Sequence, residues 1–256
     1  MSLFGALPVL FSGTTTPWMT AGDIINRAAL RVGINTATDP FTSTDQNLTL
    51  MCSLLDEIGK DLWRERVWSQ LNQIYTFTTV EGQAAYSLPD GFGFMINQTG
   101  WNRTNRLPLA GPLSPQEWEY LKAQLVGVVF TVLFRPLQQQ IYLYPDVDTP
   151  GDYEIAFEYV SRFWIQSAAA SAPDKDEPTS ADDIIWFDPH LMIRALKLAW
   201  LKQKGFDTTS AQADYDKTLL LVMGDDSAMP VLNLSGRPYQ VPLVGQQNIP
   251  LTGFGN

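Results

Sequence analysis

Few side chains in this sequence have the type and spacing that catalysis requires. The chain has one histidine, His190, which a Ser-His-Asp triad would have to use as its base, and no nucleophile stands out beside it. The adjacent Asp182 and Asp183, or the pair Glu154 and Glu158, would supply a glycosidase with its two carboxylates only if their burial and separation suited that reaction. Most carboxylates are simply solvated. We therefore expect no catalytic residues and interpret His190 as a surface or interface imidazole.

The sequence also offers few residues that could bind a metal ion or a cofactor. Cys52 is the only cysteine, so it has no partner in this chain for a disulfide. It lies beside an apolar stripe, which favours a small buried hydrophobe over a reactive thiol. No Cys and His cluster has zinc-site spacing, and the motifs of phosphate-binding loops, dinucleotide sites, zinc proteases and serine hydrolases are absent from the sequence. We expect no metal ion and no cofactor.

Composition limits the possible partners. The chain has 256 residues, of which 45% are hydrophobic, and a formal net charge of -10. Such an acidic chain does not resemble a sequence-reading nucleic-acid binder, which needs clustered Lys and Arg, although an acidic wall lets DNA slide past without adhering. Residues 3–11 are apolar but have no basic residue before them, so we expect no signal peptide. No apolar run is long enough to span a bilayer.

Helices are predicted near the start of the chain. Residues 1–19 lack periodicity and are expected to form an extended arm. A helix should begin after Thr20, its N-cap, and stop at Gly33. A longer helix is predicted over residues 43–67, because apolar residues there repeat at steps of three and four.

The middle of the chain changes to a period of two, which is typical of strands. In the last predicted strand, aromatic and aliphatic residues alternate with Glu154 and Glu158, which indicates a half-buried strand. Turn-rich connections favour antiparallel pairing. Ser114 and Glu117 have the spacing of a capping box, which predicts one short helix within this region. The strands are expected at residues 74–79, 128–134, 140–144 and 153–160.

Helix returns after residues 166–180, whose composition suggests a soft linker. A helix is predicted between Asp188 and Gly205, with Asp188 as its N-cap, Pro189 as its first residue and Gly205 as its C-terminal stop. This helix is apolar nearly all round, so it should lie at the centre of a bundle or against a neighbouring subunit. Another helix is predicted over residues 210–223.

The expected fold class is therefore α+β. We predict a bundle of about four helices, with an antiparallel β-rich domain inserted between the second and third long helices. Extended arms flank the fold at both ends. The predicted divisions are the N-terminal arm 1–19, the helical bundle 20–70 and 181–228, the β-rich insertion 71–165, the linker 166–180 and the C-terminal arm 229–256.

This order of elements, together with four sequence motifs, resembles the head-to-tail adaptor family of tailed bacteriophages, of the head-completion or tail tubular protein A type. The most telling motif is Tyr-Ser-Leu-Pro-Asp-Gly-Phe, between the first helices and the β region. The N-terminal arm of nineteen residues does not match the family. The motifs are residues 19–28 (MTAGDIINRA), 61–68 (DLWRERVW), 86–92 (YSLPDGF) and 181–189 (ADDIIWFDP), the last with its helix.

The resemblance implies a structural virion protein rather than an enzyme. Members of the family form dodecameric rings below the portal, at the head-tail junction, with helices around a DNA exit channel, a peripheral β domain and C-terminal arms that reach the portal. The implied partners are further copies of the chain, the portal and tail proteins, with DNA passing through the channel without specific binding. The arm residues expected to become ordered on the portal are Leu232, Leu234, Tyr239, Val241 and Leu243.

Two alternatives remain open from the residues alone. The acidic pairs would suit a cell-wall-degrading glycosidase. The sequence is also rich in aromatic residues, with eight Trp, nine Tyr and thirteen Phe. An aromatic platform in the β region would suit a carbohydrate-binding virion protein, although cores and interfaces are the more usual places for aromatic side chains.

Overall fold

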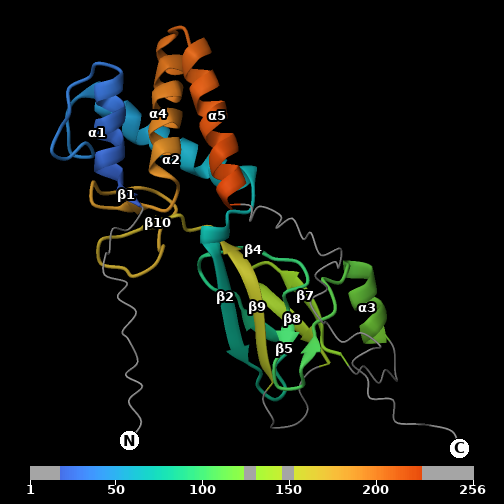
Figure 1. Cartoon of the computed structure of the whole chain (residues 1–256). Coiled ribbons are helices and arrows are strands. Elements are labelled where there is room, and N and C mark those ends of the chain that lie inside the picture. Colours follow the sequence, from blue (N-terminus) through green and yellow to red (C-terminus); the bar gives the residue numbers. More distant parts are fainter. Residues whose placement is uncertain (1–17, 124–130, 146–152, 227–256) are drawn as a thin grey trace, which may run out of the picture.

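The computed structural model describes residues 18–123, 131–145 and 153–226 of the chain. It mixes helices with antiparallel sheets, so the predicted α+β class is confirmed. Buried apolar side chains gather in two clusters, one among the helices and one between sheets. We call these regions the helical part and the β-rich part; Figure 1 shows the first above the second.

Local capping signals set the helix boundaries. The Thr20 hydroxyl accepts a hydrogen bond from the Asp23 amide at the start of α1, and Ser114 and Glu117 form the predicted capping box of α3. The cap of α4 is Asp188, followed by Pro189. The helices are α1 (Ala21–Arg31), α2 (Gln46–Glu65), α3 (Pro115–Ala123), α4 (Pro189–Lys204) and α5 (Thr209–Asp226), with a 3-10 turn η1 (Ser69–Leu71).

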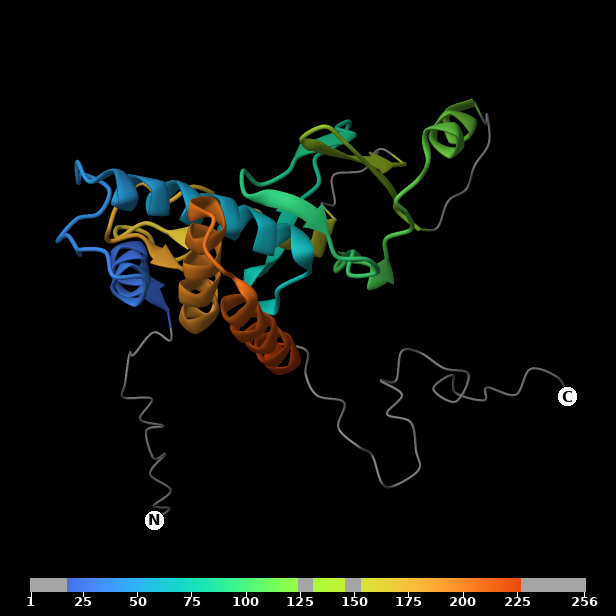
Figure 2. The same ribbon diagram turned by 90° about the horizontal axis from the view of Figure 1, so that it is seen from above.

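Helix α4 is the centre of the helical part. It packs against α1, α2 and α5, and its fully buried residues include Leu191, Met192 and Leu196. This burial explains why its sequence is apolar nearly all round. Figures 1 and 2 show α2 crossing behind α4, while α5 runs back beside α4. The four helices share one core, but they do not form a bundle of aligned helices.

Three antiparallel sheets complete the described fold. A small sheet in the helical part has the order β1-β11-β10, and the β-rich part has a five-stranded sheet, β2-β9-β5-β6 with β4 also paired to β9, and a three-stranded sheet, β3-β8-β7. The strands are β1 (Met19–Thr20), β2 (Asn72–Thr78), β3 (Ala85–Ser87), β4 (Phe92–Met95), β5 (Trp101–Asn102), β6 (Leu107–Pro108), β7 (Leu133–Leu137), β8 (Gln140–Tyr144), β9 (Glu154–Ser161), β10 (Ile165–Gln166) and β11 (Ile184–Ile185).

Strand β9 is more deeply buried than its alternating sequence predicts. Phe157 faces the core of the β-rich part, but Ala156 and Val160 on the opposite face are buried as well. Val160 belongs to the core of the helical part. The half-buried interpretation is therefore wrong for most of β9, because the end of the strand is shared between two cores.

Residues 166–180, expected to form a soft linker, are tied to the helical part. Ser167 donates hydrogen bonds to the Asp174 carboxylate from both its amide and its hydroxyl, each at 2.7 Å. Lys60 of α2 reaches Glu177 at 2.8 Å. Hydrogen bonds and an ion pair therefore hold part of this segment in place. The polar composition, which suggested a soft linker, did not reveal these contacts.

Two further differences concern the edges of the predicted elements. Strand β7 begins at Leu133, later than the strand predicted over residues 128–134, of which residues 128–130 lie outside the described residues. The N-terminal arm was predicted to end at residue 19, but Met19 pairs with Ile185 and the Trp18 ring stacks on Trp186 with centroids 5.6 Å apart. Among the described helices, none is long and apolar enough to cross a membrane.

A glycine in α2 makes room for a tryptophan in the core of the helical part. A Cβ atom built at Gly59 would overlap the indole of Trp164, which is 1% exposed. We predict that Gly59→Ala lowers the free energy of unfolding by about 1–3 kcal/mol, because the core must shift to admit the methyl group. Urea denaturation checks this. Gly224→Ala in α5 is the matched control, since nothing lies within 4 Å of its Cβ position. Equal stability of both variants would contradict the close packing.

Candidate interaction surfaces

His190 and Cys52, the residues that could act as base and nucleophile, lie on different helices and have no partner for catalysis among the contacts described below. His190 is exposed in the first turn of α4, and within the described residues it makes no hydrogen bond or ion pair. The Cys52 thiol is half-buried and lies 3.7 Å from the Pro40 carbonyl oxygen. Burial, assisted by the nearby Asp39 carboxylate, raises the pKa of Cys52 to about 11, so the thiol is protonated at neutral pH. These two residues offer no activated nucleophile.

Asp182 and Asp183 do not act as a pair. Asp182 is exposed, whereas the Asp183 side chain is 1% exposed and forms an ion pair with Lys175 at 2.8 Å. The backbone amides of Thr179 and Ser180 also donate to the Asp183 carboxylate, at 2.8 and 3.0 Å. Burial acts to raise the pKa of Asp183, but these hydrogen bonds and the Lys175 charge lower it overall. Asp183 is thus an ionised anchor for residues 175–180.

Glu154 and Glu158 are widely spaced. They lie four residues apart on β9, so their backbone positions are about 13 Å apart along the strand, whereas the two carboxyl groups of glycosidases are roughly 5–9.5 Å apart. Glu154 forms an exposed ion pair with Arg103 at 3.0 Å. Within the described residues no group of three or more His, Cys, Asp or Glu is placed to hold a metal ion.

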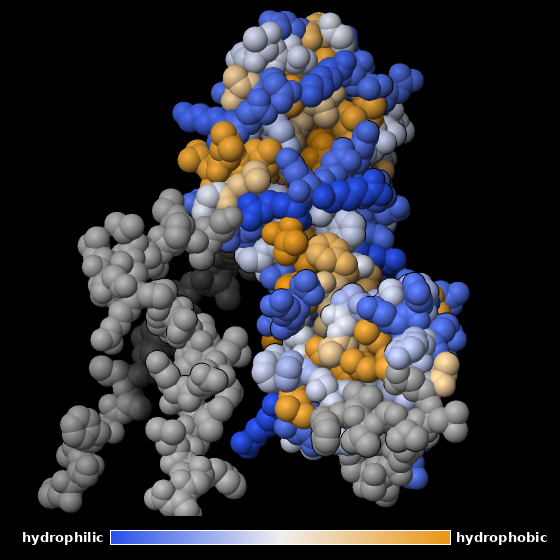
Figure 3. All heavy atoms as spheres, turned by 90° about the vertical axis from the view of Figure 1, so that its right-hand side faces the viewer, coloured by the Kyte–Doolittle hydropathy of each residue, from blue (hydrophilic) through white to orange (hydrophobic). Residues whose placement is uncertain are grey.

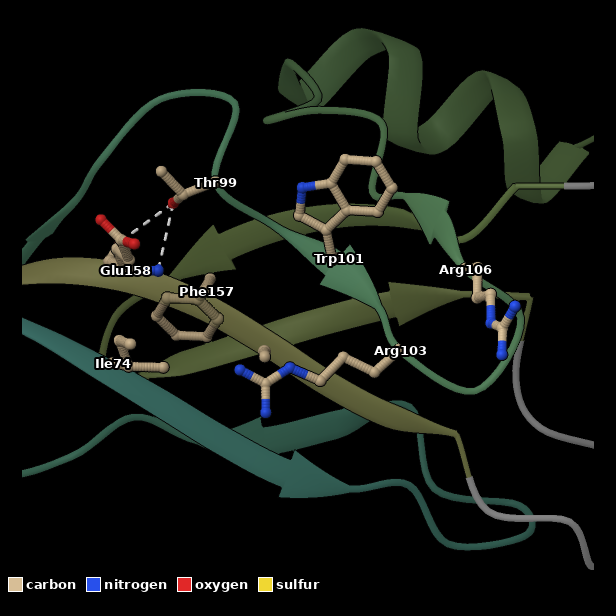
Figure 4. Close-up of a pocket in the computed structure, with 8 residues that line it drawn as sticks. Ile74, Thr99, Trp101, Arg103, Arg106, Phe157 and Glu158 are labelled. Atoms are coloured by element: carbon tan, nitrogen blue, oxygen red, sulfur yellow. Dashed lines mark hydrogen bonds between the residues drawn. The ribbon is translucent and has the colours of Figure 1, made fainter. Parts of the chain in front are cut away.

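The outer face of the five-stranded sheet carries a shallow hollow of about 360 Å³. Trp101 and Ile74 supply apolar surface, and Arg103 and Arg106 lie at one end (Figure 4). At the other end the Thr99 hydroxyl bridges to the backbone of Glu158, accepting from its amide at 3.1 Å. An exposed indole flanked by charged groups can stack on a flat ring that bears polar substituents.

A larger apolar cavity of about 710 Å³ lies between the sheets of the β-rich part. It was not predicted from the sequence, because its walls come from short strands that have little periodicity. The cavity has the size and apolar lining of a pocket for a small hydrophobic group. Its lining includes Leu88, Phe92, Met95, Leu109, Phe134 and Phe157.

The motif at residues 86–92 has a structural explanation. The Tyr86 hydroxyl accepts from the Val80 amide at 2.9 Å and contacts the Gln83 carbonyl at 2.7 Å, so it closes the turn before β3. Leu88 is buried, and Gly91 lies so close to the Phe163 ring that a Cβ atom would clash. These residues thus have structural roles within the β-rich part, and Leu88 and Phe92 also line the apolar cavity.

Two neighbouring leucines are exposed on α5. Leu220 is 70% exposed and Leu221 is 61% exposed. Figure 3 shows apolar patches scattered among hydrophilic side chains on the side of the molecule that it views. Exposed leucines that follow one another on a helix suit contact with another protein surface.

The end of α5 is fastened to the start of the β-rich part. Asp226 forms an ion pair with Arg66 at 3.1 Å and accepts from the Ser69 amide at 3.1 Å. Residues after Asp226 lie outside the described part of the chain. The five residues predicted to dock on the portal lie there: Leu232, Leu234, Tyr239, Val241 and Leu243.

The buried ion pair gives a prediction about pH. We expect Asp183→Asn to lower the free energy of unfolding by about 3 kcal/mol at pH 7, because Lys175 loses its partner. Since the pKa of Asp183 is lowered by folding, its contribution is present above the ordinary Asp pKa of about 3.9 and is lost as the pH falls through the lower folded value. Urea denaturation between pH 7 and 3 should therefore show a shallower loss of stability for this variant. Asp182→Asn is the exposed control; identical curves for the two variants would contradict the assignment.

Comparison with known proteins identifies the family. The family model described as SU10 adaptor protein matches residues 19–237, which include all the described helices and strands. No match was found among curated proteins. The match supports the resemblance noted in the sequence at the level of a phage adaptor. The chain therefore belongs to the SU10 adaptor protein family, a family of structural phage proteins related to head-tail adaptors.

Proposed function

We propose that this protein is a ring-forming subunit of the head-to-tail connector, of the head-completion or tail tubular protein A type. The observation that carries the proposal is the adaptor-family match over residues 19–237. In this role the chain works by geometry: it joins the portal to the tail and lines part of the DNA exit channel.

The proposed assembly is a dodecamer at the head-tail junction of the virion. Its partners are further copies of the chain, the portal and tail proteins. The net charge of -10 supports a channel that repels DNA phosphates and so lets the duplex pass without specific binding. A ring requires two different, complementary faces on each subunit, because its contacts are head-to-tail around the circle.

The two hydrophobic cores support a division into two domains. We assign residues 20–70 and 181–228 to a helical domain and residues 71–165 to an inserted β-rich domain, except that Trp164 and Ile165 pack in the core of the helical domain. Residues 166–180 belong with the helical domain, because Asp183 and Lys60 hold them there. In the ring, the helical domain would form the subunit contacts and the β-rich domain the periphery.

The exposed leucines of α5 are proposed to contact the adjacent subunit. We predict that Leu220→Asp prevents ring formation in the presence of the portal, because it would bury an unpaired carboxylate in the interface. Native mass spectrometry checks the stoichiometry. Ser210→Asp adds the same charge at another exposed position of α5 and should assemble normally. Full assembly of the Leu220→Asp protein would exclude α5 from the contact.

The C-terminal arm is proposed to dock on the portal through Leu232, Leu234, Tyr239, Val241 and Leu243. A chain that ends at Met229 should lose portal association yet still fold, since the core residues in the described part of the chain all precede Met229. Co-sedimentation with portal rings checks binding. Portal binding at full affinity by the shortened chain would rule out this docking role.

Carbohydrate binding is a second candidate, favoured by one observation. Trp101 is 36% exposed in a hollow flanked by Arg103 and Glu158, an arrangement that suits a sugar ring. If this is a function of the protein, binding on a glycan array should disappear in Trp101→Ala. Tyr120→Ala, which removes an exposed aromatic side chain on α3, should keep it. An unmodified protein that binds no glycan would eliminate this candidate.

A further inference from the structure

Strand β2 forms an open edge of the five-stranded sheet. It pairs with β9 along its whole length, from Asn72 opposite Val160 to Thr78 opposite Glu154. Among the described residues no strand pairs with its other side. Figure 1 shows β2 at the rim of the β-rich part, with no further strand outside it.

The alternation of the ladder identifies the backbone groups at this open edge. The Thr79 amide donates to the Tyr153 carbonyl at 2.9 Å, so Thr79 faces the β9 side. Backbone groups of alternate residues point to the same side of a strand, and Tyr75 and Phe77 therefore face β9 as well. The amides and carbonyls of Ile74, Thr76 and Thr78 point to the open edge, and the side chains of these three residues are exposed.

The edges formed by β6, β7 and β3 are protected in ways that β2 is not. Strand β6 has only two residues and includes Pro108, and β7 contains Arg135 and Pro136. Strand β3 has three residues. In contrast, the seven residues of β2 include no charged residue, proline or glycine. Exposed edges of this kind pair readily with another strand, and natural proteins normally shield them.

The described part of the chain ends near the start of β2. The Asp226 carboxylate accepts from both the amide and the hydroxyl of Ser69, three residues before β2 begins. The ion pair with Arg66 fixes the same carboxylate. Thirty residues, 227–256, follow from this point. Extended chain advances about 3.3 Å per residue, so this segment can reach every position of β2.

One stretch of that segment suits the open edge in composition and in spacing. Residues 231–235, Val-Leu-Asn-Leu-Ser, form its longest run without proline or glycine, and they are uncharged. Val231 lies five residues after Asp226, and Ile74 lies five residues after Ser69. A strand that starts at the Asp226–Ser69 contact and runs parallel to β2 therefore places residues 231–235 beside residues 74–78.

We propose that residues 231–235 of the same chain pair in parallel with the open edge of β2. The strand would supply partners for the amides and carbonyls of Ile74, Thr76 and Thr78. This proposal stands independently of the proposed connector function. If both hold, Leu232 and Leu234 must leave β2 before they dock on the portal, so portal binding and β2 pairing compete for these residues.

Amide hydrogen exchange of the isolated protein, followed by NMR, tests the pairing. In the full chain the amides of Ile74, Thr76 and Thr78 should exchange at least about tenfold more slowly than in a chain ending at Met229. The amides of Tyr75, Phe77 and Thr79 are internal controls and should exchange equally in both chains, because they face β9. Equal exchange of Ile74, Thr76 and Thr78 in the two chains would overturn the proposal.

Point variants assign the effect to the proposed residues. Leu232→Pro combined with Asn233→Pro should remove the protection, because prolines at adjacent positions break either alternation of the added strand. Gln246→Pro combined with Gln247→Pro is the matched control and should leave the protection intact. Protection that persists in the Leu232→Pro, Asn233→Pro protein would exclude residues 231–235 as the occupant.

A mixing experiment distinguishes the chain's own segment from that of a neighbour. Isotope-labelled chain ending at Met229 is combined with unlabelled full chain. If pairing occurs within one chain, the labelled amides of Ile74, Thr76 and Thr78 stay fast to exchange. Slow exchange in the labelled chain would mean that a second copy donates the strand, which contradicts the proposal.

Discussion

The structure depends on the burial of the end of β9 between two cores. Phe157 packs in the β-rich part, while Val160, three residues later, is completely buried in the helical part. The Trp63 indole of α2 donates to the Ser161 carbonyl at 2.8 Å, and Trp164 occupies the space that Gly59 leaves in α2. Burial of such large side chains is worth several kcal/mol each. Strand β9 and the residues that follow it thereby fix the position of the β-rich part on the helices. The position of the open β2 edge is fixed with it.

The sequence predicted what local interactions determine. The caps at Thr20, Asp188 and Ser114 involve residues three positions apart, so the sequence alone reveals them. The central burial of α4 was likewise readable from its apolar residues on all sides. For the candidate site, His190 is exposed in the first turn of α4, whereas Cys52 is half-buried and not the fully buried hydrophobe that its neighbours in the sequence suggested.

What the sequence did not reveal depends on contacts between distant segments. Strand β11 has two residues and exists because Met19 and Ile165, which are far apart in the sequence, pair with Ile185 on its two sides. The anchoring of residues 175–180 by Asp183 was missed for another reason: its contacts are local, but the polar composition of the segment resembles that of a linker. The open edge of β2 is also a property of topology: a strand with this sequence would be ordinary in the middle of a sheet.

The claim that this chain is a connector subunit is tested most directly by native mass spectrometry of the purified protein, alone and mixed with its cognate portal. The account predicts that the portal gathers the chain into one stoichiometric ring, twelve copies on the portal assembly. A protein that remains unassociated in every mixture with the portal would contradict it.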